Sequence, residues 1–253
     1  MKKQFLICAA LVTLFACHKK DDPVTTTPVN VDPQLKVSFE HVVNNQPLVL
    51  KTAKYTNAHG DTFSVSTYKY YISNVSVYTN DGTEYKEPES YHLIDEAKSD
   101  SKSFVLTNLP KATYVKIKFL LGVDSTRNVS GAQTGALDPL NTMFWTWNTG
   151  YIMARMEGTS PQTNPYPDNL GFHIGRFKGT NNVLKWITLE FPSNAVITDT
   201  HAPGVHIKSD IAEWFKTPNV IDFAKLSVVA AEGANAKLIA DNYADMFTVD
   251  HID

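Results

Sequence analysis

The sequence predicts a mainly β protein, an antiparallel β-sandwich with one or two short helices near its C-terminus. Apolar and polar residues alternate along several segments, and turn residues separate these segments. No regular succession of strand, helix and strand is visible, which argues against a parallel α/β fold. The folded part is expected to begin near Leu35 and run to Asp253, long enough for one large domain without internal repeats.

The predicted strands rest on alternation, because side chains of a strand point to its two faces in turn. The longest alternating segment covers residues 63–78 and stops at the turn Asn80-Asp81-Gly82. The other predicted strands, in chain order, are residues 35–40, 91–94, 103–106, 114–120 and 184–191, with an aromatic-rich region over 143–156.

Helix signals are confined to the last quarter of the chain. Ser209 and Asp210 can cap a short helix from Ile211 to Phe215, which Pro218 would end. Residues 234–246 form a second candidate, with apolar residues near one helical face.

A polar, turn-rich stretch over residues 122–141 is too long for an ordinary connection. A loop of this length is typically functional or disordered. It is either pinned by hydrogen bonds of its own Asp and Asn residues, or mobile. Asp124, Asn128 and Asp138 could hold calcium through oxygen ligands, or could cap the turns of the loop itself.

Residues 1–16 have the layout of a secretory signal peptide. Lys2 and Lys3 precede a short apolar run, Phe5–Ala16, which is shorter than the roughly 20 residues of a membrane-spanning helix. The run ends in Leu14-Phe15-Ala16-Cys17, which resembles the bacterial lipobox and predicts lipidation of Cys17. The alternative is a plain signal peptide cut near Ala16.

The segment 17–34 is predicted to be the lipidated Cys followed by a flexible, Pro-punctuated linker. Its first residues, His18-Lys19-Lys20-Asp21-Asp22, resemble the surface-export signal of Bacteroidetes lipoproteins. The predicted location is therefore the outer membrane, on the cell surface or the periplasmic face, with the lipid anchor as the membrane contact.

The net charge and the number of cysteines exclude several classes of function. The formal net charge of −3 becomes −5 when Lys2 and Lys3 leave with the signal peptide, which argues against nucleic acid as a partner. Cys8 leaves as well, so the mature chain has a single Cys and neither a disulfide framework nor a thiolate metal site. Common phosphate-binding, dinucleotide-binding, zinc-protease and serine-hydrolase motifs are missing, which favours a binding protein over an enzyme.

A metal site in such a chain has to use groups such as imidazole, and eight His residues are present. His173 lies between Gly171 and Gly175, which allow close approach of other groups, although a lone strand His is often a core residue. His206 follows His201 in a Pro-Gly stretch that is predicted as a loop, and His41 follows the first strand. Imidazole suits copper, zinc, iron and nickel alike.

The aromatic segment 143–151 is the densest part of the chain. If it is a strand, Met143, Trp145, Trp147 and Thr149 share one face. Core packing explains one buried Trp, whereas two on one face beside the long loop also suit a binding site.

These segments together resemble a known family. Residues 70–75, Gly122-Val123-Asp124-Ser125, residues 135–139, the aromatic segment 143–151 and Phe172-His173-Ile174-Gly175 occur in the order seen in MbnP-like copper-binding proteins, and the tail 240–247 is similar to that of Bacteroidetes lipoproteins of the family. The resemblance implies a single β-rich domain over residues 35–253.

The resemblance also implies a copper role. In methanotroph members a diheme peroxidase oxidises a Trp to kynurenine, which helps to bind copper beside His ligands. Trp145 and Trp147 fall in the Trp motif and His173 in the His-Gly motif, whereas Ser73 stands where some members place a His. His41 and His206 are further ligands by their chemistry only.

Two functions follow as expectations. The first is a copper-binding lipoprotein for metal acquisition or handling, with a diheme peroxidase or an outer-membrane transporter as partner. It predicts that at least two of His41, His173 and His206 meet near Trp145 or Trp147. The second is a surface module that binds a glycan, a peptide or an outer-membrane partner through exposed aromatics. A structural lipoprotein with all its aromatics in the core is a third reading.

Overall fold

The computed structural model describes residues 31–131, 133–147, 150–164 and 168–253. The predicted signal peptide 1–16, Cys17 and the linker up to residue 30 lie outside these ranges, as does Thr149. In the described part of the chain, no helix has the length and apolarity needed to cross a membrane.

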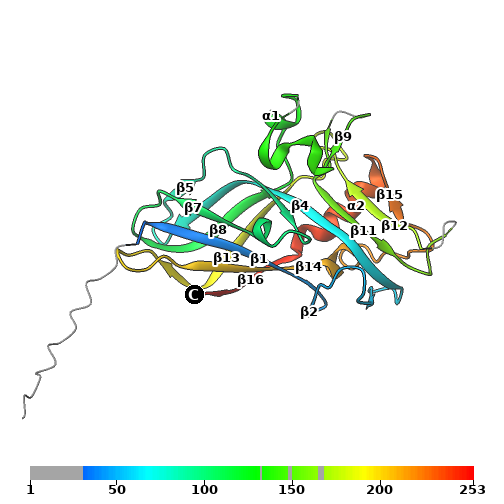
Figure 1. Cartoon of the computed structure of the whole chain (residues 1–253), viewed down its shortest axis with the longest axis horizontal. Helices are drawn as coiled ribbons and strands as arrows, with labels where there is room; N and C mark the ends of the chain where they lie inside the picture. The colour runs from blue at the N-terminus through cyan, green and yellow to red at the C-terminus, as the bar shows by residue number, and fades with distance from the viewer. Residues whose placement is uncertain (1–30, 132, 148–149, 165–167) are drawn as a thin grey trace, which may run out of the picture.

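Two sheets and their edge strands make up the body of the protein, which confirms the predicted mainly β sandwich. Figure 1 shows β1, β14 and β16 along one side, with β4, β8 and β11 along the other. The smaller sheet has the order β16 (Phe247–Ile252), β14 (Gly204–Asp210), β1 (Gln34–Val43) and β2 (Gln46–Pro47), with β7 (Ser103–Thr107) also paired to β1.

The larger sheet is built around the long strand β4 (Thr62–Thr79). Its order is β13 (Lys185–Val196), β8 (Thr113–Leu121), β4, β11 (Ala154–Thr159), β12 (Leu170–Ile174) and β15 (Val228–Val229). The short strands β3 (Tyr55–Thr56), β5 (Glu84–Lys86) and β6 (Tyr91–Asp95) also pair with β4. Aromatic side chains fill the space between the sheets, where Phe39, Phe119 and Phe247 contact one another edge to face.

Not all strand pairs are antiparallel, which differs from the predicted all-antiparallel arrangement. β1 pairs with β14 in parallel, and β12 pairs with β15 in parallel. Each pair joins strands that are distant in the chain, so no hairpin forces them to run in opposite directions.

The helices are short. η4 (Ile211–Phe215) is the predicted capped helix, in 3₁₀ form, with the Asp210 side chain accepting from the Ala212 N–H. α2 (Ala234–Asn242) is the second predicted helix and continues as η5 (Tyr243–Asp245). The remaining turns are η1 (Ser99–Lys102), α1 (Ser125–Asn128), η2 (Gly135–Leu137) and η3 (Pro139–Asn141).

Candidate functional site

The described residues of the long segment 122–141 are pinned to the larger sheet. Asp124 and Asn128 of the segment take part, as the first of the two alternatives predicted. Tyr71 of β4 donates to the Ala136 carbonyl at 3.1 Å, and Tyr151 donates to the Leu137 carbonyl at 2.7 Å. The two tyrosine rings meet edge to face, with centroids 5.6 Å apart. Figure 1 shows the segment, with α1 and the neighbouring strand β9, projecting from one side of the sandwich.

Asp124 is the anchor of this segment. It caps α1 by accepting from the Arg127 N–H, and it also accepts from the side chains of Asn74 at 2.8 Å and Tyr91 at 2.9 Å. Burial alone would raise the pKa of Asp124, but these hydrogen bonds outweigh it and hold the pKa below its usual value. Asp138 caps η3 in the same way. Both carboxylates therefore serve the turns of the loop, the alternative to a calcium site.

A two-strand hairpin carries the Trp motif beside this segment. β9 (Phe144–Trp145) pairs with β10 (Gly150–Tyr151), and the chain turns away directly after Trp145. Trp145 is buried whereas 65% of Trp147 is exposed, so these residues do not form one face of a continuous strand. The two indole rings still contact each other, with centroids 5.5 Å apart.

His173 lies on β12, two residues before Gly175, which the Trp145 ring covers. It alternates with the buried Phe172 and Ile174 on β12, so its side chain is on the outer face of the larger sheet together with Gly175. The Trp145 ring covers Gly175 so closely that a Cβ there would be 2.5 Å from the ring. Gly175 follows His173 by two residues, so this contact brings the Trp hairpin to the end of the strand that carries His173.

The imidazole is held by charged residues of β11. His173 Nε2 lies 2.8 Å from Glu157 Oε1, and Arg155 donates to the same oxygen at 2.7 Å. Burial would raise the pKa of Glu157, but the hydrogen bonds from His173 and Arg155 lower it below its usual value. Arg155 also donates to the Thr142 carbonyl, which ties this group to the start of the Trp hairpin.

His41 lies elsewhere, between the two sheets. Its Nδ1 is 2.7 Å from Glu96 Oε2 and its Nε2 is 2.9 Å from the Tyr70 hydroxyl. The rings of Tyr68 and Tyr70 contact it edge to face. His41 is therefore a satisfied core histidine, and its nitrogens are already engaged.

His206 lies on β14 and not in a loop, which corrects the reading of the Pro-Gly stretch. Its neighbour across the strands is His251, and the two rings stack at 4.2 Å with an angle of 9°. His206 Nε2 is 3.1 Å from Asp253 Oδ2. The pair was missed because the pairing of β14 with β16 is a tertiary contact.

The three predicted His ligands therefore do not converge, and the prediction that at least two of them meet near Trp145 or Trp147 is wrong. His41 points between the sheets, His206 lies on the outer side of the smaller sheet and His173 on the outer side of the larger one. Of the three, only His173 lies on a strand whose neighbouring residues, Gly175 and Arg155, contact the Trp hairpin or the segment just before it. Ser73 is fully buried and donates to the Gly122 carbonyl at 2.7 Å, so it is part of the support for the loop.

The burial of His41 gives a pH-dependent stability. Burial lowers the pKa of His41 below its usual 6.5, although Glu96 opposes this shift. The unfolded chain therefore takes up a proton at a pH where the native chain does not, and the free energy of unfolding should fall as pH drops below about 6.5.

Chemical denaturation between pH 7 and pH 5 measures this effect. His41→Gln, which cannot titrate, should lose less stability over this window than the wild type. Equal losses in the two proteins would contradict the assignment of the effect to His41.

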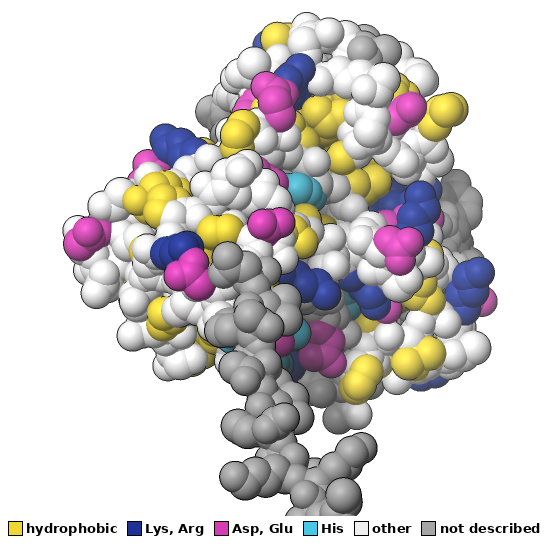
Figure 2. Space-filling view, turned by 60° about the vertical axis from the view of Figure 1, so that its left-hand side comes forward, with side chains coloured by type: hydrophobic (Ala, Val, Ile, Leu, Met, Phe, Trp, Pro, Cys, Tyr) yellow, Lys and Arg dark blue, Asp and Glu magenta, His cyan; other side chains and the backbone are white. Residues whose placement is uncertain are grey.

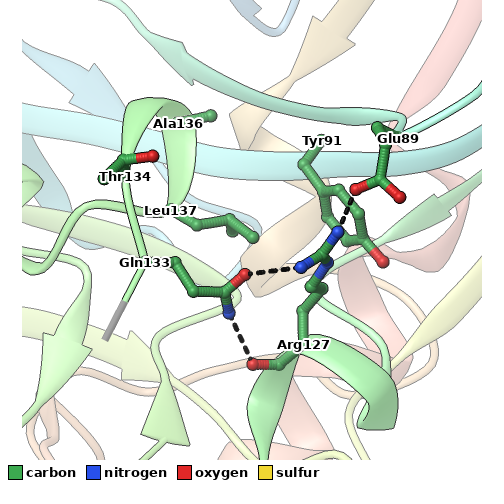
Figure 3. Close-up of a pocket in the computed structure, with 7 residues that line it drawn as sticks. All are labelled: Glu89, Tyr91, Arg127, Gln133, Thr134, Ala136 and Leu137. Carbon is green, nitrogen blue, oxygen red and sulfur yellow. Dashed lines mark hydrogen bonds and ion pairs between the residues drawn. The ribbon is translucent and has the colours of Figure 1, made fainter. Parts of the chain in front are cut away.

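A cavity of about 510 Å³ opens beside the same loop. The Arg127 guanidinium lies over the Tyr91 ring at 5.6 Å, donates to the Gln133 side chain and pairs with Glu89 (Figure 3). The charged groups that line the cavity, Arg127 and Glu89, pair with each other. The cavity lining therefore does not favour a charged ligand. Its lining residues are Glu89, Tyr91, Arg127, Gln133, Thr134, Ala136 and Leu137.

Comparison with known proteins decides the family. The family model described as MbnP matches residues 32–233. This chain belongs to the MbnP family. The match ends before α2 and β16, so the His206–His251 pair is only partly inside the region that matches MbnP.

A solved structure of an MbnP is also similar. MbnP from Methylosinus trichosporium shares 14% identity with this chain, over 72% of this chain and 76% of that one, at a TM-score of 0.49. No curated protein sequence matches the chain.

Proposed function

We propose that this MbnP-family protein is an exported lipoprotein that binds copper at the outer face of β11 and β12, for metal acquisition or handling. The observation that supports it is the contact geometry of the His and Trp motifs. Trp145 covers Gly175, two residues after His173, and contacts the Trp147 ring.

The donor set at this place suits copper. Glu157 engages Nε2 of His173, and Nδ1 has no hydrogen-bond partner among the described residues. A carboxylate that holds one imidazole nitrogen, with the other left for the ion, is the usual arrangement around metal-binding His. Imidazole is a ligand that copper accepts readily. One imidazole alone is a modest ligand set, so we expect modest affinity in the unmodified chain.

An oxidised Trp would add a donor at the same place. Trp147 is the more accessible of the two indoles, since most of its surface is exposed whereas Trp145 is buried. We therefore infer that Trp147 is the residue for a partner peroxidase to modify. Intact mass and peptide mapping of the native protein test this, because an unmodified Trp147 would contradict it.

The copper site is tested by titrating Cu(I) into the mature chain with Cys17→Ser, which removes the competing thiol. His173→Ala should weaken binding about tenfold or more, equivalent to about 1.4 kcal/mol. His206→Ala is the matched control, because it removes a strand His that lies on the other sheet. If His173→Ala binds copper as tightly as the parent does, the proposed site is wrong.

Exposed apolar side chains favour a second function, the binding of a glycan or a peptide. Val129, Leu140 and Trp147 are largely exposed and all come from the segment between β8 and β10. Exposed apolar surface of this kind often marks an interaction site. If this second function is correct, Trp147→Ala abolishes binding of the glycan or peptide, and addition of copper does not change that binding in the parent protein.

The surface charge gives no support to a nucleic-acid partner. On the described part of the face drawn in Figure 2, Lys and Arg side chains are interspersed with Asp and Glu. Binders of nucleic acid need a continuous basic patch.

A further inference from the structure

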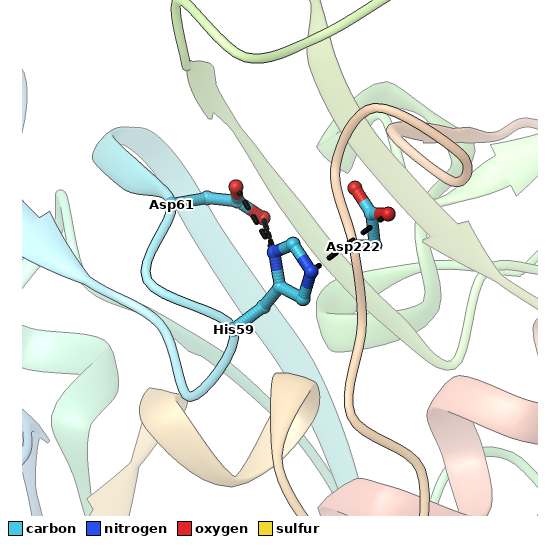
Figure 4. A group of neighbouring side chains, drawn as sticks. All are labelled: His59, Asp61 and Asp222. Carbon is cyan, nitrogen blue, oxygen red and sulfur yellow. Dashed lines mark hydrogen bonds and ion pairs between the residues drawn. The ribbon is translucent and has the colours of Figure 1, made fainter.

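A second group of potential metal ligands lies at the start of β4. His59 and Asp61 belong to the turn before this strand, and Asp222 belongs to the segment that follows η4. The two segments are joined by hydrogen bonds, from Asn57 Nδ2 to the Ile221 carbonyl at 3.0 Å and from the Phe223 N–H to Asp61 Oδ2 at 2.9 Å. Figure 4 shows the imidazole between the two carboxylates.

The three side chains are gathered without being tightly bonded to one another. One ligand atom from each lies within 4.8 Å of the others. His59 Nδ1 is 3.3 Å from Asp61, and His59 Nε2 is 3.8 Å from Asp222 Oδ2. Good N–H···O bonds are shorter, about 2.7–3.2 Å. Asp222 Oδ2 also pairs with Lys225 Nζ at 2.9 Å, and the Lys225 side chain is 82% exposed, so this ammonium can swing away when an ion binds.

The carboxylates are oriented from outside the group. Asp61 is buried, and its Oδ2 accepts from Asn57 Nδ2 as well as from the Phe223 N–H, so Oδ1 remains directed at His59. Asp222 Oδ1 accepts from the Ala224 N–H. Outer hydrogen bonds that fix ligand carboxylates are a regular feature of metal sites.

We propose that His59, Asp61 and Asp222 bind a divalent transition-metal ion of the Zn²⁺ type. One imidazole nitrogen and two carboxylate oxygens are ligands that zinc accepts, with water in the remaining position. Calcium prefers six to eight oxygen ligands, so it fits this donor set poorly.

Binding requires a small movement. Ligand atoms about 2.1 Å from one zinc ion lie about 3.4 Å apart in tetrahedral geometry. Nδ1 of His59 now faces Asp61 and Nε2 faces Asp222, so the ring has to turn until one nitrogen shares the ion with both carboxylates. The His59 side chain is 44% exposed and can turn, whereas Asp61 is fixed. The bound ion would then cross-link the turn before β4 to the segment after η4.

This group is independent of the copper proposal. Thr62, next to Asp61, and Tyr71, which supports the Trp hairpin, are nine residues apart on β4, or roughly 30 Å along the strand. Failure of one site therefore leaves the other untouched.

The test is thermal unfolding and calorimetric titration of the metal-free mature chain, carrying Cys17→Ser, with Zn²⁺. We expect one equivalent to bind and the unfolding midpoint to rise with free Zn²⁺. His59→Ala and Asp222→Asn should abolish both effects. Because His59 is exposed, the metal-free His59→Ala protein should melt close to the parent, which shows that it folds.

The matched control is the double variant His206→Ala/His251→Ala, which removes a different His group that zinc could use. It should keep the full response. A response that persists in His59→Ala, one that is lost in the double variant, or a parent that binds no Zn²⁺ would overturn the proposal. A rise with Ca²⁺ in place of Zn²⁺ would overturn the assigned class of metal.

Discussion

Replacement of Gly158 by Ala is expected to lower the free energy of unfolding by about 3 kcal/mol. A Cβ at this position would lie 1.8 Å from the Ser64 carbonyl oxygen and 2.9 Å from the carbonyl carbon. Both are backbone atoms of β4, so the clash can be relieved only by moving β11 away from β4. The pairing of these strands is already irregular between Glu157 and Gly158, which indicates that the close approach is built into the sheet.

Gly171→Ala is the matched control. Gly171 lies on the neighbouring strand β12, opposite Glu157, and a Cβ there would meet no atom within 4 Å. Its stability should stay close to that of the wild type, or rise slightly because Ala restricts the unfolded chain. Chemical denaturation of both variants measures the difference. Equal losses would show that close packing at Gly158 is not the cause.

Asn242→Ala is expected to cost a similar amount, about 3 kcal/mol, for a different reason. Asn242 is fully buried at the end of α2. Its Nδ2 donates to the carbonyls of Trp214 and Asn219 at 2.9 and 2.7 Å, and its Oδ1 accepts from the Asn219 N–H at 2.8 Å. Truncation leaves the buried Trp214 carbonyl and the part-buried backbone groups of Asn219 without this partner, and that is the costly outcome for a hydrogen bond.

Asn235→Ala provides the comparison on the same helix. Asn235 is exposed in the first turn of α2, and Ala is the better helix former, so stability should be unchanged or slightly higher. A loss at Asn235 as large as that at Asn242 would show that the buried hydrogen bonds of Asn242 are not the cause. Proteolysis of the segment between η4 and α2 should speed up in Asn242→Ala alone.

Alternation in the sequence was enough to find the central strands. The predicted strand over residues 63–78 is β4, and the segments 35–40 and 114–120 lie inside β1 and β8. These strands have one side in the core, so burial enforces the period of two. The capped helix at Ile211 was equally visible, because its signal is local.

Features that depend on contacts between segments far apart in the sequence could not be predicted from alternation or from local signals. β14 begins at Gly204, directly after Pro203, and this Pro-Gly pair suggests a loop. Only the pairing of the segment with β1 and β16 makes it a strand. Trp147 was assigned to the face of Trp145 because a longer strand was assumed, whereas β9 ends at Trp145.

Part of the candidate site could be predicted from the sequence. The glycines around His173 suggested close approach, and Gly175 is indeed approached by the Trp145 ring and the Tyr151 carbonyl. Nothing near His41 in the chain indicates that Glu96 and Tyr70 will occupy both its nitrogens. The His59 group was missed for the same reason, since Asp222 comes from the other end of the sequence.

The parallel pairing of β1 with β14 has a consequence for how the chain acquires its structure. Lys36 pairs with Gly204, so the smaller sheet joins segments from opposite ends of the described chain. Contacts between such distant segments slow folding, because a large loop has to close before they form. The sandwich therefore stays open until residues 204–210 are free to join β1. Late folding suits the export proposed above, since a chain has to stay unfolded while it is threaded through a membrane channel.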